Sequence, residues 1–279
     1  MSNYYCLVAG LPDLSMDESK KVYSVTNFKE ELYPNLSSDD KKLIDLYFLK
    51  YDNHDLLKLL KHKNASMDKR GNFTAEQLGA LINSAKEGDT PDKTIPSYFY
   101  EFLEVYFQRH EEEDFMAEDY LAGCYFNYAM KCSNRFVSAW FEFNLNVNNL
   151  LAAYTSRKYK LDVASNVIGS SEICEAIRTS TARDFGLTGI LDYFEKVQHI
   201  SETDSLVEKE KKIDQLKWDW METESFFNYF SIEKIFVFLL KLELIERWNI
   251  LDKEKGNEMF RNIIQHLKDE VKIPEDYQK

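Results

Sequence analysis

The five residues from His110 to Asp114 form the densest cluster of metal-binding side chains in the sequence. The run His110-Glu-Glu-Glu-Asp114 offers one imidazole and four carboxylates, which are ligands for divalent cations. A dinuclear carboxylate site in a helical bundle requires Glu-x-x-His on two helices. The chain contains no Glu-x-x-His, so we interpret this run as the charged end of a helix.

Two further patterns resemble metal sites only in part. Glu195 and His199 are four residues apart on an expected helix, but no second ligand pair accompanies them, which favours a solvated helix face. The segment 68–76 superficially resembles a calcium-binding loop. Placing Gly71 at the required sixth position puts Arg70 at the fifth and Gln77 at the twelfth, where oxygen ligands of a carboxylate type are needed. We therefore predict no metal-binding residues.

Nucleophilic and nucleotide-binding chemistry has equally little support. Cys174 is the best candidate for a cysteine nucleophile, but no recognisable motif surrounds it. There is no Walker A sequence, and Gly186 and Gly189 do not complete a dinucleotide fingerprint. The four cysteines form no Cys-x-x-Cys pair and are interpreted as reduced thiols of a cytosolic protein. We predict a non-catalytic protein without catalytic residues or a cofactor.

The charge balance argues against two classes of partner. The chain has 48 acidic and 35 basic side chains and a net charge of −13, which repels nucleic acid and matches anionic lipid head groups poorly. No basic stretch precedes the short apolar run 4–11, so a signal peptide is not expected. The apolar run 226–245 contains Glu233, Lys234 and Lys241, which argue against membrane insertion.

The elements that must position these residues are predicted to be helices. Nine Gly and five Pro are few for 279 residues, and no βαβ pattern is present, so the expected fold is a single all-α domain over residues 1–279. Residues 3–13 could begin as a strand or a helix, and residues 88–96 form the best linker candidate. Ser37 and the sequence Thr74-Ala-Glu-Gln77 are typical helix starts. Helices are expected at 27–33, 74–86, 98–108, 172–178, 206–223 and 258–271. A longer helix is expected from about residue 40, and 52–63 either continues it or forms the next helix. Residues 115–159 should form two helices broken near 131–134, residues 191–200 a helix capped by Thr188, and residues 226–250 a helix that is followed by a break at Gly256.

The helix at 140–159 is the element around which the others are expected to pack. It has no Gly or Pro, and apolar residues recur along it at helical spacing on more than one face. Asn146 and Asn149 lie on the narrow polar strip that the apolar faces of this helix leave. Because an unpaired buried polar group costs about 1–3 kcal/mol, both amides are predicted to be hydrogen-bonded structural residues.

A similar pair of polar residues recurs at nearly even spacing along the chain. The pairs are Asp52 with Asp55, Asn146 with Asn149, and Glu243 with Glu246. Their second members are 94 and 97 residues apart, which predicts a threefold internal repeat. Three unrelated amphipathic helices are the alternative.

Aromatic residues are abundant, with 17 Tyr and 19 Phe. Core packing is the default interpretation for most of them. Tyr98, Tyr100, Tyr106 and Phe107 are dense enough on one helix to form a partner-binding surface instead.

The N-terminal residues resemble a known family. The sequence Asn3-Tyr-Tyr-Cys-Leu-Val-Ala-Gly-Leu-Pro12, followed by segments 27–32 and 36–40, is similar to the opening of the bacterial DUF2764 family. Members of that family are associated with V-type ATPases of Bacteroidetes-type bacteria. They look like distant forms of the C subunit of these ATPases, which is called d in eukaryotes. That protein is a funnel of three helical lobes carrying the motif Glu-x-x-Asn-Leu-Arg-x-Ile. Here Asn149-Leu150 alone keeps the Asn-Leu pair, and no copy keeps the Arg.

The resemblance implies a funnel-like array with lobes at 1–90, 91–200 and 201–279. It also implies a non-catalytic central-stalk component that links the soluble shaft to the membrane rotor ring in proton or sodium transport. Its partners would be other V-type ATPase subunits, and its location would be cytoplasmic, peripheral to the inner membrane through the complex. A free-standing helical adaptor that binds a protein through an aromatic surface is the alternative, and a helical-bundle metalloenzyme is a weaker one.

Overall fold

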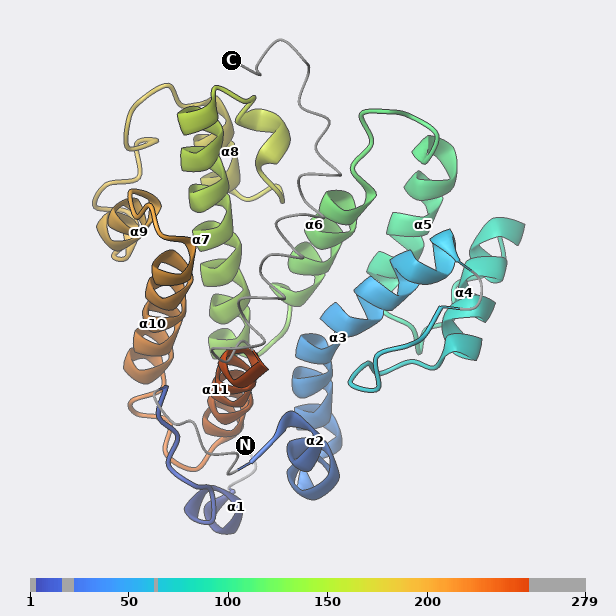
Figure 1. The fold of residues 1–279 in the computed structure, drawn as a ribbon. Coiled ribbons are helices and arrows are strands. Elements are labelled where there is room, and N and C mark those ends of the chain that lie inside the picture. The colour runs from blue at the N-terminus through green and yellow to red at the C-terminus, as the bar shows by residue number, and fades with distance from the viewer. Residues whose placement is uncertain (1–3, 17–22, 63–64, 251–279) are drawn as a thin grey trace.

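Helices make up all the regular structure in residues 4–16, 23–62 and 65–250, the part of the chain that this computed structural model describes (Figure 1). The all-α prediction is therefore confirmed. The α-helices are α1 Tyr5–Ala9, α2 Val25–Asn27, α3 Ser38–Lys61, α4 Ala75–Glu87, α5 Ser97–Arg109, α6 Ala117–Ala129, α7 Arg135–Tyr159, α8 Glu172–Thr179, α9 Phe194–Ser201, α10 Leu206–Glu224 and α11 Ile232–Ile250. A π-helical turn, Phe28–Leu32, and a 3-10 turn, Tyr33–Asn35, follow α2, and a second 3-10 turn, Ala164–Asn166, follows α7.

Local capping signals account for several helix starts. The Ser37 side chain accepts the backbone N–H of Asp40 at the start of α3, and Thr74 and Gln77 form the expected reciprocal capping box of α4. The helix that begins after Ser37 continues without a break through 52–61. This segment is therefore the continuation of that helix and not a separate one. The N-terminal segment is helical as α1 rather than extended.

Two predicted helix starts are wrong. The helix expected from Leu191 begins at Phe194, and the residue before it, Tyr193, provides no side-chain cap, so Thr188 does not cap this helix. The helix expected from Phe226 begins at Ile232, because residues 226–231 form a turn after α10. The predicted helix at 258–271 and the break at Gly256 lie outside the described residues.

The helix α7 is the centre of the packing. It contacts α6, α8, α9 and α11, and Figure 1 shows it with α9 and α10 on one side and α6 on the other. Buried residues lie on several of its faces, among them Trp140, Phe141, Val147 and Leu150. Because each face meets a different neighbour, α7 can be apolar around most of its circumference without exposing that surface.

The helix α11 is buried over much of its surface although it carries charged residues. Its Lys241 is 8% exposed, pairs with Glu222 of α10 and lies with its ammonium group 4.4 Å from the centre of the Trp218 ring. In the described part of the chain, no helix combines the length and apolarity required to cross a bilayer.

Candidate functional site

The first polar pair of the predicted repeat holds the loop that precedes α4. Asp52 is fully buried, and its carboxylate accepts the backbone N–H groups of Asn72 at 2.8 Å and Phe73 at 3.0 Å. One helical turn later, Asp55 accepts the N–H of Asp68 at 2.7 Å. The two carboxylates therefore fix the backbone of residues 68–73 against α3 and position the start of α4.

This contact also explains Gly71, the residue that suggested a calcium loop. A Cβ atom at this position would lie 2.5 Å from the Asp52 carboxylate oxygen Oδ1. Glycine is required here for close approach of the backbone to Asp52. The segment is a carboxylate-anchored loop followed by a capped helix.

The second polar pair holds the loop that precedes α8. The Asn149 side-chain amide donates to the carbonyl of Ile168 at 2.7 Å, and its oxygen accepts the N–H of the same residue at 2.9 Å. Asn146 donates to the Tyr193 hydroxyl at 3.2 Å. Both amides are 1% exposed, so the prediction that they are buried is confirmed. The predicted hydrogen bonding is confirmed for both groups of Asn149 and for the donor of Asn146, whose Oδ1 atom has no partner among the described residues.

The candidate nucleophile Cys174 belongs to the same contact region. Its thiol is fully buried, accepts a contact from the Asn149 amide at 3.3 Å and lies 3.1 Å from the Ser171 hydroxyl. Ser171 in turn caps α8. The thiol is therefore a packing group at the second anchored loop, and all four cysteines are unpaired thiols.

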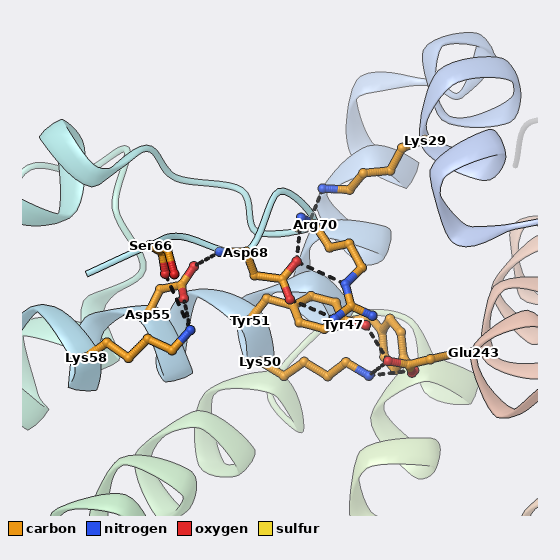
Figure 2. A network of polar contacts seen from close by, with 10 residues as sticks. All are labelled: Lys29, Tyr47, Lys50, Tyr51, Asp55, Lys58, Ser66, Asp68, Arg70 and Glu243. Atoms are coloured by element: carbon orange, nitrogen blue, oxygen red, sulfur yellow. Dashed lines mark hydrogen bonds and ion pairs between the residues drawn. The ribbon is translucent and has the colours of Figure 1, made fainter. Parts of the chain in front are cut away.

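The third polar pair reaches a segment at the other end of the chain. Glu246 accepts the backbone N–H of Val25, the first residue of α2, at 2.9 Å. Glu243 contacts the Lys50 ammonium and the Tyr51 hydroxyl of α3. The third pair thus ties α11 to the N-terminal segment through Glu246 and to α3 through Glu243, and Figure 2 shows the contacts of Glu243.

The second member of each pair therefore makes the same kind of contact. Asp55, Asn149 and Glu246 each accept a backbone N–H from a segment beside a capped helix start, at Thr74, Ser171 and Ser24 respectively. The residue whose N–H is bound is 13 positions later in the first case, 19 later in the second and 221 earlier in the third. The three helices thus share one kind of contact. The threefold repeat and the division of the chain into three lobes both stay predictions.

The contacts around Glu243 extend into a network that joins α3, α11 and the first anchored loop (Figure 2). Arg70 binds both oxygens of Asp68, at 3.0 and 2.7 Å, and its guanidinium lies 4.1 Å from the centre of the Tyr51 ring. The Lys50 ammonium lies 4.0 Å from the centre of the Tyr47 ring. Cations therefore bridge carboxylates and aromatic faces across the junction.

Burial controls the titration of this junction. Desolvation raises the pKa of Glu243 to about 8, with a smaller contribution from the nearby carboxylate of Glu246. Desolvation also lowers the pKa of Lys50 well below its usual value. Burial likewise raises the pKa of Asp52 to about 6, against the opposing effect of its backbone hydrogen bonds. The Lys50 and Glu243 side chains are 32% and 20% exposed, so their ion pair is partly desolvated.

The remaining chemistry-bearing residues lie apart from this junction. His110 follows the end of α5, where Arg109 binds Glu112 at 2.7 Å, as expected for a charged helix end. Glu195 and His199 are exposed on α9. Within 4–16, 23–62 and 65–250, no three His, Cys, Asp or Glu side chains form a group able to hold a metal ion.

The prediction of a partner-binding aromatic surface on α5 is wrong for Tyr98. Tyr98 is 1% exposed, stacks on Phe99 and binds Asn53 through its hydroxyl at 2.5 Å. Tyr100, Tyr106 and Phe107 are half-buried and pack against the core.

Three strongly exposed aromatic residues lie instead in the turn between α10 and α11. Phe226, Phe227 and Tyr229 are 61%, 82% and 59% exposed, and Tyr5 of α1, whose ring lies 4.3 Å from that of Phe230, is 56% exposed. We call Tyr5, Phe226, Phe227 and Tyr229 the aromatic turn. The sequence did not indicate this surface because residues 226–231 have the composition of the apolar helix that follows them.

The fold and these contacts define an all-helical protein whose buried polar residues hold loops and helices together. Residues 1–271 match the family model described as "Protein of unknown function (DUF2764)", and the chain belongs to this family. The resemblance seen in the N-terminal residues is therefore confirmed at the level of the family. No curated protein and no solved structure matches the chain.

Proposed function

We propose that this protein is a non-catalytic central-stalk component of a V-type rotary ATPase, similar to the C subunit of such motors. In this role it would lie between the soluble shaft and the membrane rotor ring, on the cytoplasmic side of the inner membrane. The observation that carries the proposal is the common role of α3, α7 and α11. Each presents a polar residue, buried at positions 55 and 149 and half-buried at position 246, to the backbone of a segment beside a helix start.

That arrangement suits a part that transmits torque. A coupling protein must resist deformation, and loops are normally the parts of a fold that deform first. Here three such segments are bound to helices through charged or amide side chains that are buried or half-buried. Asp52 and Asp55 together accept three backbone N–H groups from one loop. The loops are thus made part of the rigid body, as the proposed function requires.

Affinity purification from native membranes tests the proposal. A tagged copy of the full chain, extracted in mild detergent from its own host, should recover the ATPase shaft and rotor-ring proteins in near-stoichiometric amounts. The measurement is quantitative mass spectrometry of the eluate, with an untagged strain as control. Recovery of the tagged chain without any other ATPase component would contradict the proposal.

A free-standing adaptor is the second candidate, and the aromatic turn favours it. Side chains as exposed as Phe227, at 82%, and Phe226, at 61%, are typical of protein-binding surfaces. The double substitution Phe226→Ser/Phe227→Ser should then abolish recovery of a partner other than the ATPase. Ile190→Ser, at a 62% exposed position elsewhere, is the matched control and should retain that partner. If every protein recovered with the chain belongs to the ATPase, the adaptor proposal fails.

A further inference from the structure

A cavity of 670 Å³ lies between the C-terminal end of α7, the helix α9 and the N-terminal end of α10. Figure 1 shows α9 beside α7, with α10 starting below it. Its charged lining consists of four cations and two carboxylates, which are Arg157, Lys158, Arg183, Lys209, Glu202 and Asp204. A chain with a net charge of −13 therefore has a cavity whose lining is net positive.

One cation of this cavity lacks a partner. Lys209 is half-buried, and its ammonium forms no hydrogen bond or ion pair with any residue that the structure describes. Burial lowers the pKa of Lys209, the nearby ammonium of Lys158 lowers it further, and the carboxylate of Glu210 opposes these two effects. Two cations held close together in a partly desolvated cavity repel one another, and a bound anion would remove that repulsion.

The contact that Lys158 does make is weak. Its ammonium lies 3.5 Å from the Asp204 carboxylate, and the two side chains are 57% and 95% exposed. Exposed ion pairs of this kind contribute about 0–1 kcal/mol. An anion can therefore replace Asp204 at Lys158 with little loss.

Arg157 and Lys209 have different roles in this cavity. Its guanidinium donates to the carbonyls of Ala182 at 2.7 Å and Ser180 at 2.8 Å, so it is a structural residue that holds the segment after α8. Cations near a helix C-terminus offset its negative dipole end. Lys209, however, comes from the first turn of α10, where a cation opposes the dipole of its own helix.

One uncharged feature of the cavity also suits an anion. The helix α10, of 19 residues, begins at the cavity, and the N–H groups of its first turn carry partial positive charge.

From this arrangement we propose that the cavity binds a phosphate-bearing small molecule of about nucleotide size. The phosphates would lie between Lys158, Lys209 and the first turn of α10. The volume lies within the range of about 300–1,000 Å³ usual for small-molecule sites. This proposal does not depend on the ATPase proposal, because it rests on a different part of the molecule.

Isothermal titration calorimetry with the full chain tests the site, using ATP, inorganic tripolyphosphate and adenosine as probes. ATP and tripolyphosphate should bind and adenosine should not, since the phosphates supply the recognised charge. Lys209→Gln should weaken tripolyphosphate binding by about tenfold or more.

The matched control is Lys196→Gln, which removes the same charge from an exposed position of α9 outside the cavity lining. It should leave tripolyphosphate affinity unchanged, and circular dichroism should show that each variant remains folded. Absence of ATP and tripolyphosphate binding at millimolar concentration would overturn the proposal. Equal weakening by Lys196→Gln and Lys209→Gln would also overturn it, because binding would then follow net charge alone.

Discussion

Replacing Asn149 by Leu would remove the contact that fixes the second anchored loop. The Asn149 amide binds both backbone groups of Ile168, at 2.7 and 2.9 Å, and is 1% exposed. Leucine has a similar branched shape and is tolerated in helices, but it offers neither a donor nor an acceptor. The substitution therefore leaves the N–H and the carbonyl of Ile168 without their partner while keeping the side-chain position filled.

The expected cost follows from those two groups. Each buried backbone group left unpaired costs about 1–3 kcal/mol, which gives about 2–6 kcal/mol for the pair. Part of this cost is offset, because a buried Leu gains about 1.5–3 kcal/mol relative to an exposed one and because Ile168 is only half-buried. We expect Asn149→Leu to lower the free energy of unfolding by about 1–3 kcal/mol.

Urea unfolding followed by circular dichroism measures this change. Asn148→Leu is the matched control, because Asn148 is the exposed neighbour on the same helix and its replacement should change stability by less than about 0.5 kcal/mol. The slope of the unfolding free energy against urea concentration should be the same for both variants. If Asn149→Leu unfolds at the same urea midpoint as Asn148→Leu, the amide bridge does not stabilise the fold and the structural role of the repeat is refuted.

Two further predictions concern the first anchored loop and the aromatic turn. Burial raises the folded-state pKa of Asp52 to about 6. The contribution of the protonated Asp52 side chain to the free energy of unfolding is therefore fully present below pH 4 and is lost as the pH rises through 6. Asp52→Asn keeps the oxygen that accepts from Asn72 and Phe73. This variant should therefore gain about 2 kcal/mol on the wild type between pH 4 and pH 7 in urea unfolding, and a difference that does not change with pH would contradict the assignment. Phe227→Ser should leave the thermal midpoint almost unchanged, because this ring is 82% exposed. Phe99→Ala, at a fully buried position, should lower the free energy of unfolding by about 3–5 kcal/mol and lower the thermal midpoint with it. Equal shifts of the thermal midpoint in the two variants would contradict the burial assignments.

Helix existence and several helix starts were determined by the sequence alone. Ser37 and Thr74 with Gln77 cap helices through hydrogen bonds that span three residues, so the bonding partners lie inside the same short window of sequence. The scarcity of Gly and Pro and the 3.6-residue period likewise predicted long helices. The two misplaced starts, at Phe194 and Ile232, occur where a turn has the composition of a helix.

The sequence also indicated which residues of α7 would need partners. Asn146 and Asn149 lie on a helix that is apolar around most of its surface, and burial of an amide requires a hydrogen bond. The spacing of the three polar pairs was readable as well. Neither pattern named the partners.

Only the tertiary structure decided those partners. The N–H bound by Asp55 lies 13 residues away, whereas the N–H bound by Glu246 lies 221 residues away. Likewise, the cavity around Lys209 exists because α10 starts beside the C-terminal end of α7, about fifty residues earlier in the chain. Contacts within one helical turn depend on the residues of that turn, so the sequence alone predicts them. Contacts between distant segments depend on how the whole set of apolar faces packs, because that packing brings those segments together.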